Sequence, residues 1–295
     1  MLKKTFYCEN PCHLSIKHQQ LVIAPKPNGQ AKSRPVEDLG FIILDNQQIT
    51  FTQSVIQQMA KYNVAVVFCD KQHHPDSMLF HLDSHQTQTE HFRAQIEASK
   101  PLKKQLWKQT VKAKIRNQAA LLSFADEDDQ ALCYLARKVQ SGDPDNKEAR
   151  ASRIYWPLLF GDAFRRRRHG NVPNNLLNYG YAVLRAAVAR ALTGSGLLPT
   201  LGIHHHNKYN AYCLADDIME PYRPFVDKTV WELYENGQAK DELDNTLKAA
   251  LLHILSSDIF IGHKTRPLMV GLSETTASLA RCFKKEVRKV EYPEL

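Results

Sequence analysis

The chain has 295 residues, 43% hydrophobic and 24% charged, with a formal net charge of +8 at pH 7. This length is long for one hydrophobic core and suits two domains. A run of about 18 apolar residues, as a membrane-spanning helix requires, does not occur, and the basic start MLKKTFYCEN lacks the apolar segment of a secretory signal. We therefore expect a cytoplasmic protein without a membrane partner. The positive charge favours a polyanionic partner, nucleic acid first.

Short β-rich segments separated by Pro, Gly and Asn fill the first seventy residues. They are HLSIK, QLVIAP, FIILDNQQITFT and VAVVFCD. One short helix, residues 54–62, interrupts them, with Val55, Ile56 and Met59 at helical spacing. We predict an N-terminal β-domain over residues 1–75, followed by a polar, histidine-rich linker within residues 70–95.

Helical patterns replace the strand signal beyond this linker. They cover residues 100–123, 128–139, 146–160, 174–191, 211–234, 241–255 and 273–290. Glycines follow several of the expected helix ends, while Asn174, Asp241 and Ser273 are candidate N-caps. We therefore predict the α+β class, in which residues 76–295 form the linker and a larger, all-helical catalytic domain.

The segment KPLKKQLWKQTVKAKIR, residues 100–116, contains seven basic residues and no acidic one. Five of them recur at every fourth position: Lys100, Lys104, Lys108, Lys112 and Arg116. On an α-helix this spacing forms a slowly winding ridge that could follow a phosphate backbone. The alternative is a solvated helix face, although such faces normally mix both signs. We predict that Lys104, Lys108 and Lys112 bind DNA.

A second basic cluster, FRRRRHG, follows the helix that is expected to end at residue 160. It contains four adjacent arginines, Arg165, Arg166, Arg167 and Arg168. Their mutual repulsion favours a nearby anion, and the guanidinium group suits bidentate contact with phosphate. The alternative is that two of them cap carbonyl groups at a helix C-terminus or pair with acids.

The stretch GIHHHNKYNAYCLADDIMEPYRP, residues 202–224, combines three histidines with several carboxylates. Asp217 and Glu220, three residues apart, share a helical face. Pro221 should bend or break this helix just after Glu220. The histidines could bind a metal ion, or they could form an exposed polar loop.

Glu148 lies in the first turn of another expected helix, DNKEARASRIYWPLLFG. Spacing alone does not single it out, because an acid there commonly complements the helix dipole. If a histidine and two carboxylates converge, the ligand set suits Mg²⁺ or Mn²⁺ better than structural zinc. A hard cation beside a basic groove is typical of phosphodiester chemistry.

Three separated motifs carry a family resemblance. GIHHHNKYNAYCLADDIMEPYRPFVD resembles the G-x-x-H…L-x-x-D-L-M-E-P-F-R-P…D motif of the CRISPR-associated spacer-acquisition integrases, the endonucleases common to CRISPR adaptation modules. NKEARASRIYWPLLF, followed by NNLLNYGYAVLR, is similar to that family's glutamate-bearing helix. The N-terminal strands are similar to its β-domain. The form DDIMEPYRPFVDKTVWE looks most like members from systems with a single large effector nuclease.

The resemblance implies that Glu148, His205 and Glu220 are the catalytic residues and hold Mg²⁺ or Mn²⁺, with Asp217 and His204 as secondary ligand candidates. His206 also flanks the expected ligand. The implied reaction is a transesterification, in which the 3′-hydroxyl of a captured double-stranded DNA fragment attacks a phosphodiester at the end of a CRISPR repeat. The resemblance also implies a homodimer bridged by a small CRISPR-associated adaptation partner protein.

Two other functions are compatible with the same residues. A metal-dependent, structure-specific DNA repair nuclease would use the same chemistry without joining strands. A non-catalytic DNA-binding scaffold would use the histidines and acids structurally.

Overall fold

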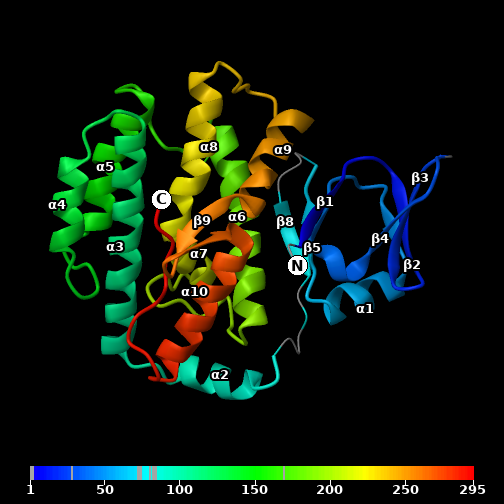
Figure 1. Cartoon of the computed structure of the whole chain (residues 1–295), viewed down its shortest axis with the longest axis horizontal. Coiled ribbons are helices and arrows are strands. Elements are labelled where there is room, and N and C mark those ends of the chain that lie inside the picture. The colour runs from blue at the N-terminus through cyan, green and yellow to red at the C-terminus, as the bar shows by residue number, and fades with distance from the viewer. Residues whose placement is uncertain (1–2, 28, 72–74, 80, 82–84, 169) are drawn as a thin grey trace. The chain divides into compact units, whose positions relative to one another are not determined.

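The computed structural model describes residues 3–27, 29–71, 75–79, 81, 85–168 and 170–295. The chain divides into two compact units, Met1–Gln86 and Thr87–Leu295 (Figure 1). It is mixed α and β, with most strands in the first unit and mainly helices in the second. The predicted boundary at residue 75 falls at the start of a strand of the N-terminal unit, β8 (Pro75–Leu79). Residues 72–74, 80 and 82–84 of the predicted linker lie outside the described residues.

Two four-stranded sheets and one helix, α1 (Gln53–Lys61), build the N-terminal unit. The first sheet has the order β1-β5-β7-β8 and the second β4-β3-β2-β6. The other strands are β1 (Lys4–Cys8), β2 (Cys12–Lys17), β3 (Gln20–Pro25), β4 (Lys32–Pro35), β5 (Leu39–Leu44), β6 (Thr50–Phe51) and β7 (Ala65–Cys69). Strands β1, β5 and β7 run parallel, and β5 is buried along its whole length, as expected for the middle of a parallel sheet.

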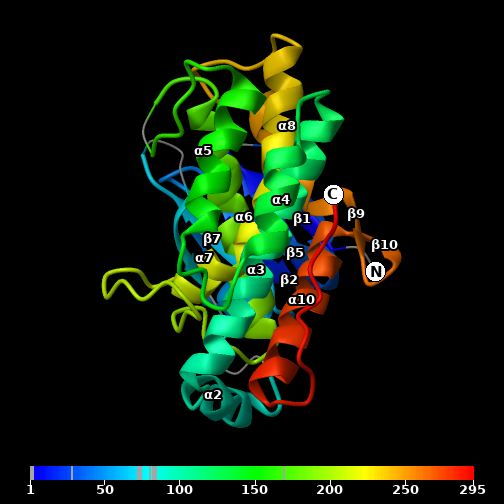
Figure 2. The same cartoon turned by 90° about the vertical axis from the view of Figure 1, so that its left-hand side faces the viewer.

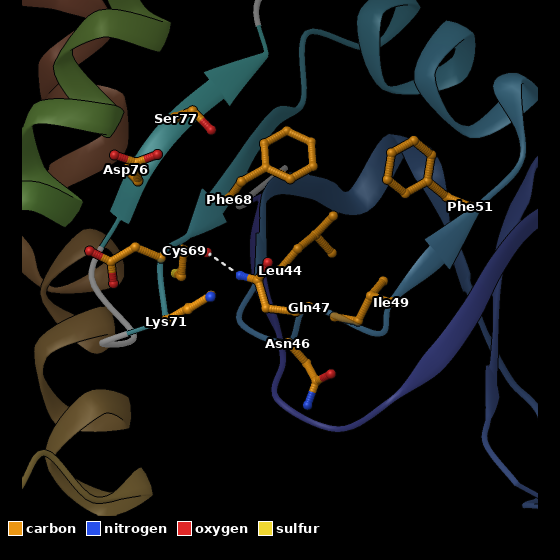
Figure 3. Close-up of a pocket in the computed structure, with 11 residues that line it drawn as sticks. Leu44, Asn46, Gln47, Ile49, Phe51, Phe68, Cys69, Lys71, Asp76 and Ser77 are labelled. Atoms are coloured by element: carbon orange, nitrogen blue, oxygen red, sulfur yellow. Dashed lines mark hydrogen bonds between the residues drawn. The ribbon is translucent and has the colours of Figure 1, made fainter.

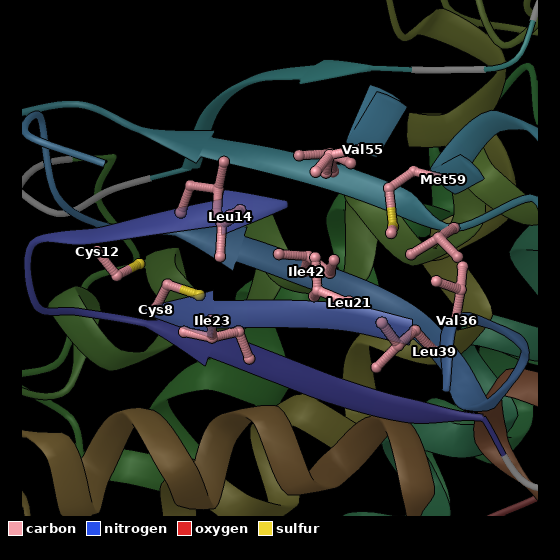
Figure 4. Packing of buried hydrophobic residues seen from close by; sticks show 13 residues of the cluster. Cys8, Cys12, Leu14, Leu21, Ile23, Val36, Leu39, Ile42, Val55 and Met59 are labelled. Atoms are coloured by element: carbon pink, nitrogen blue, oxygen red, sulfur yellow. The ribbon is translucent and has the colours of Figure 1, made fainter. Parts of the chain in front are cut away.

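The core of this unit lies where the two sheets and α1 meet (Figure 4). Leu14 and Leu21 from the second sheet pack with Ile42 of the first, and α1 contributes Val55 and Met59. The helix predicted over residues 54–62 and the four predicted strand segments are therefore present. Strands β1, β4 and β8 are additional, and the exposed sequence KSRP of β4 explains why no apolar alternation indicated it.

A cavity of about 410 Å³ lies at the carboxyl ends of β5 and β7 (Figure 3). Phe51 and Phe68 form part of its wall, with ring centroids 6.3 Å apart. The Gln47 side chain crosses it and donates a hydrogen bond to the carbonyl of Cys69 at 3.1 Å. The wall of the cavity thus combines apolar side chains with polar ones, and one of the polar side chains, Gln47, is hydrogen-bonded within the unit.

Eleven described helical segments form most of the second unit, and its longer helices share one general direction (Figures 1 and 2). The α-helices are α2 (Gln88–Ile96), α3 (Lys100–Phe124), α4 (Gln130–Lys138), α5 (Lys147–Phe160), α6 (Asn174–Gly194), α7 (Cys213–Met219), α8 (Arg223–Glu235), α9 (Asn245–His253) and α10 (Leu268–Phe283). Short 3-10 turns add η2 (Glu220–Tyr222) and η3 (Ile254–Ser256). Helix α3 packs against α4, α5 and α8, and α6 packs against α7, α8 and α10. None of the helices in the described ranges has the length and apolarity needed to cross a lipid bilayer.

Four sequence predictions for this unit need correction. The unit is not all-helical, because β9 (Asp258–Ile261) and β10 (Lys264–Pro267) form an antiparallel hairpin. The expected linker contains α2, whose mixed composition gave little helical periodicity. The last helix begins at Leu268, so Ser273 lies inside it, and Asp244 rather than Asp241 caps α9 by accepting from the Leu247 N–H. The predicted break after Glu220 is present as η2.

Candidate active site

The loop before α7 is built around the buried carboxylate of Asp217. Its Oδ2 accepts backbone hydrogen bonds from Ile203 at 2.7 Å and His204 at 3.0 Å, and its Oδ1 accepts one from His205 at 3.2 Å. Gly202 makes this close wrap possible, since a Cβ there would lie 2.2 Å from the His205 carbonyl oxygen and 2.8 Å from Asp217 Oδ2. The loop conformation therefore depends on one carboxylate and one glycine.

The imidazole of His205 is oriented by the same carboxylate. Its Nδ1 lies 2.6 Å from Asp217 Oδ1. This hydrogen bond raises the pKa of His205 against the opposing effect of burial. With Nδ1 engaged, Nε2 is the ring's remaining ligand atom, as in carboxylate–histidine–metal arrangements. Asp217, which the sequence predicts as a secondary metal ligand, has both of its oxygens engaged by the loop.

The neighbouring histidines have different surroundings. The ring of His204 stacks on Trp107 with centroids 4.1 Å apart and an interplanar angle of 1°, and burial lowers its pKa. His206 is exposed, and its Nδ1 lies 2.8 Å from the His204 carbonyl oxygen. Of the three, His205 alone is aligned by a buried carboxylate, which favours it as the ligand.

Glu148 lies in the first turn of α5, at a helix start that is capped by another carboxylate. Asp143 accepts hydrogen bonds from the backbone N–H groups of Lys147 at 2.9 Å and Glu148 at 3.0 Å, and Asn146 accepts one from Ala149. These bonds satisfy the first N–H groups of the helix, so the side chain of Glu148 is available for other contacts.

Glu220 is buried at the break between α7 and α8. Arg223 Nε lies 2.8 Å from its Oε1, and Lys114 Nζ lies 2.5 Å from its Oε2. Burial alone would raise the pKa of Glu220, but these two cations lower it to about 2. The carboxylate is therefore ionised over the whole physiological range.

Lys114 of α3 joins the two glutamates. Its ammonium group forms an ion pair with Glu148 as well as with Glu220, although its side chain is only 8% exposed. Burial would lower the pKa of Lys114, but the two carboxylates outweigh burial and raise it. Glu148 and Glu220 thus converge on a single positive charge.

This arrangement fits a divalent cation. No three His, Cys, Asp or Glu side chains in the described part of the chain are gathered closely enough to hold a metal ion as they stand. However, the two carboxylates already share one cation, and the buried Oε2 of Glu220 makes no hydrogen bond of good geometry. Together with His205 Nε2, they offer the oxygen and nitrogen donors that suit Mg²⁺ or Mn²⁺.

Sequence reasoning did not find Lys114 as a site residue, although a signal was present. It belongs to the basic segment, but it lies about 200° around the helix from Lys112, at 100° per residue. On that side it falls among the apolar positions Val111, Ile115 and Ala119, all of which are buried. A lysine on an apolar helix face indicates a buried acidic partner.

The predicted basic ridge of α3 lies largely at the surface. Lys100, Lys104 and Arg116 are exposed, whereas Lys108 and Lys112 are partly buried. Partial burial and the nearby charges of Arg116 and Lys108 lower the pKa of Lys112. The positive charges are therefore crowded, as a surface that binds an anion requires.

The four arginines after α5 do not act as one group. Arg165 donates to the carbonyl groups of Asp162 and Phe164, which resembles the capping alternative. Arg166 turns inward and donates to Asn174 and Asn178. Arg167 and Arg168 remain exposed.

A buried carboxylate, Asp227 of α8, connects the helices around the site. Tyr155 of α5 donates a hydrogen bond to it at 2.8 Å, and Tyr181 of α6 donates another. Arg223 lies over the ring of Tyr181, 4.4 Å from its centroid. Burial raises the pKa of Asp227 to about 6, while the two tyrosine hydrogen bonds limit the rise. Sequence analysis did not single out this residue.

The fold and these contacts define a candidate nuclease centre, in which two glutamates and an aligned histidine lie in a helical unit with a basic helix. Comparison with known proteins agrees with this class. The family model for CRISPR associated protein Cas1 matches residues 6–263. The chain is 36% identical to the CRISPR-associated endonuclease Cas1 of Neisseria meningitidis serogroup C (strain 8013), over 100% of this chain and 97% of that protein. The chain therefore belongs to the Cas1 family, the endonucleases and integrases of CRISPR adaptation.

Solved structures share the fold. A casposase bound to integration product has a TM-score of 0.81 at 20% identity, covering 98% of this chain and 92% of that chain. A chain of a Cas6-RT-Cas1–Cas2 complex has a TM-score of 0.73 at 19% identity, covering 97% of this chain and 35% of that longer chain. At these identities the likeness concerns the fold alone.

Proposed function

We propose that this Cas1 protein is a divalent-metal-dependent integrase, and that Glu148, His205 and Glu220 hold Mg²⁺ or Mn²⁺. The convergence of both glutamates on the ammonium of Lys114 carries this proposal. Like charges are not buried together unless a cation accompanies them, and the site presents a histidine nitrogen as well. Asp217 acts as the positioning residue of His205.

The reaction is a strand transfer. The 3′-hydroxyl oxygen of a captured double-stranded DNA fragment attacks a phosphorus atom at the end of a CRISPR repeat; one P–O bond forms, and the bond to the 3′ oxygen of the cut strand breaks. When bound, the metal ion polarises the phosphoryl oxygen and lowers the pKa of the attacking hydroxyl. Arg223 holds Glu220 in place, and Lys114 balances the charge of both glutamates. No side chain becomes covalently attached to DNA.

We propose that DNA follows the ridge of α3, with Lys104, Lys108 and Lys112 in contact with phosphates, and that Arg167 and Arg168 extend this surface. Replacement of the three lysines by glutamine should reduce the slope of log K against log salt by about 0.9 for each lost phosphate contact. Replacement of the exposed lysines Lys240, Lys264 and Lys289 is the matched control. If both triple variants have the wild-type slope, α3 presents only a solvated face.

We also make a proposal about the oligomeric state of this protein and its complex with a partner. Structures with the same fold are titled as a casposase bound to integration product and as a complex that contains Cas1 and Cas2. We propose by analogy that this chain forms a homodimer and that a small Cas2-like adaptation partner bridges two such dimers. Light scattering coupled to size exclusion, with and without the partner, measures both states.

The decisive experiment supplies a linear fragment with 3′-hydroxyl ends and a supercoiled plasmid that carries the repeat. An integrase joins the two, whereas a repair nuclease only cuts. Glu148→Gln should abolish joining in Mg²⁺ or Mn²⁺ while DNA binding survives, and Glu235→Gln at the exposed end of α8 is the control. Joining that survives Glu148→Gln would contradict the site, and an absence of any metal-dependent reaction in the wild type would favour the scaffold.

A further inference from the structure

The segment 288–295 runs as non-helical chain alongside α3 and α10 (Figures 1 and 2). Gln109 of α3 holds its first part. The side-chain Nε2 of Gln109 donates to the carbonyl of Arg288 at 3.0 Å, and its Oε1 accepts from the N–H of Val290 at 2.9 Å. The backbone of this segment is therefore fixed to the helix that also carries the lysine of the candidate site.

Asn117 of α3 connects the same segment to the helix break beside Glu220. Its side chain belongs to a buried residue, only 3% exposed. The Nδ2 group donates to the carbonyl of Pro293 at 3.0 Å and to that of Pro221 at 2.8 Å. The Oδ1 atom accepts from the N–H of Leu295 at 3.3 Å. One buried amide thus joins three backbone groups, and one of the three lies directly after Glu220.

A second connection reaches the same break through α10. The hydroxyl of Tyr222 lies 2.6 Å from Thr275 Oγ1, and Thr275 donates to the carbonyl of Glu291 at 2.6 Å. Because this donation uses the one hydroxyl proton of Thr275, Tyr222 is the donor of the first bond. Both side chains are fully buried. The two residues that follow Glu220 are therefore each tied to the segment 288–295.

The break at η2 needs such support because two prolines interrupt its backbone. Pro221 and Pro224 have no N–H group, so neither can donate to the preceding turn. Asn117 supplies a donor from another helix to the first carbonyl after Glu220. It lies three residues from Lys114 on α3, so one helical face holds both the carboxylate of Glu220 and the backbone beside it. A shift of this backbone would turn the Cα–Cβ bond of Glu220 away from the site.

We propose that Asn117 is a positioning residue of the metal site, which together with the segment 288–295 holds Glu220 in the direction that metal binding requires. The inference rests on the proposed function. Asn117 contacts neither metal nor DNA in this role; it acts on Glu220 through the carbonyl of Pro221. Groups that orient a metal ligand contribute about 10- to 100-fold to metal affinity.

The affinity for Mn²⁺, measured by titration calorimetry on the full-length protein without DNA, tests this role. Asn117→Leu should weaken Mn²⁺ binding about 10- to 100-fold, while DNA binding in EDTA, followed by fluorescence anisotropy, stays at the wild-type level. Gln109→Leu is the matched control, because it removes two hydrogen bonds between α3 and the same segment without reaching the break. It should keep the wild-type Mn²⁺ affinity. Wild-type affinity in Asn117→Leu, or an equal loss in both variants, would overturn the inference.

Tyr222→Phe keeps the inference testable if Asn117→Leu does not fold. This variant removes one hydroxyl from the second connection and retains the buried ring. It should weaken Mn²⁺ binding about 2- to 10-fold, the equivalent of one neutral hydrogen bond. Wild-type Mn²⁺ affinity in Tyr222→Phe would then overturn the inference.

The coupling to Glu220 is also measured without metal, by urea unfolding in EDTA. Asn117→Leu, or Tyr222→Phe in its place, is combined with Glu220→Gln. The change in the unfolding constant of the double variant should differ from the product of the single changes by about 2-fold or more. Gln109→Leu and Glu220→Gln should multiply. Multiplicative changes in the first pair would overturn the inference, whereas a wild type that binds no Mn²⁺ would count against the proposed function alone.

Discussion

Lys114→Gln should make the metal-free protein less stable and its metal site stronger. Loss of one partner from a buried ion pair costs about 3 to 5 kcal/mol, because the remaining charge is left uncompensated. Arg223 stays 2.8 Å from Glu220, so we expect the lower end, about 3 kcal/mol. Without the competing ammonium group, the two glutamates should bind Mn²⁺ more tightly; tenfold tighter binding adds about 1.4 kcal/mol of stabilisation at saturating metal.

Urea unfolding followed by tryptophan fluorescence measures this directly. All three tryptophans of the chain, Trp107, Trp156 and Trp231, lie in the helical unit, so the signal reports the unit that carries the site. Lys240→Gln is the control, since its pair with Asp244 is exposed and contributes little to stability. A Lys114→Gln variant as stable as wild type in EDTA, or one that Mn²⁺ stabilises less than wild type, would refute the reasoning.

Three further changes test the surroundings of the site. Asp217→Asn should lower the pKa of His205 and weaken Mn²⁺ binding about 10- to 100-fold, as measured by titration calorimetry; unchanged affinity would mean that Asp217 does not act through His205. Asp227 has a pKa raised to about 6, so it favours the folded state while protonated, and this contribution is lost as the pH rises from about 4 through 6. The stability difference between wild type and Asp227→Asn should therefore fall by about 3 kcal/mol between pH 4 and 7, and a constant difference would contradict the raised pKa. Gly202→Ala should destabilise the helical unit by about 1 to 3 kcal/mol and impair strand transfer, because its Cβ has no space beside the His205 carbonyl; wild-type stability would show that the loop can move aside.

The sequence predicted elements best where one periodicity dominates. The long helix of α3 and the buried strand β5 have clear patterns, and Pro221 marked the break that produces η2. The hairpin β9–β10 escaped notice because its strands are only four residues long and one of them, KTRP, is polar. Short polar strands form because of their neighbours in space, and a local pattern cannot indicate those neighbours.

For the candidate site, prediction from the sequence was limited in a different way, by its dependence on tertiary packing. Glu148 occupies a position where an acid usually serves the helix dipole, so only the family resemblance distinguished it. Its convergence with Glu220 depends on the packing of α5 and α8 against α3, which no local pattern encodes. The same packing turned Lys114, one of seven basic residues in its segment, into the partner of both acids.

The position of Lys114 also explains how the helical unit can fold before it meets metal or DNA. Without a cation, the buried Glu220 and the partly buried Glu148 would repel each other and would favour protonation, yet the pKa of Glu220 is lowered to about 2. The ammonium group supplies the missing charge from within the chain, at the place where both carboxylates point. A divalent ion would then meet two carboxylates that already converge on one positive charge, so metal binding would require displacement of the Lys114 ammonium group.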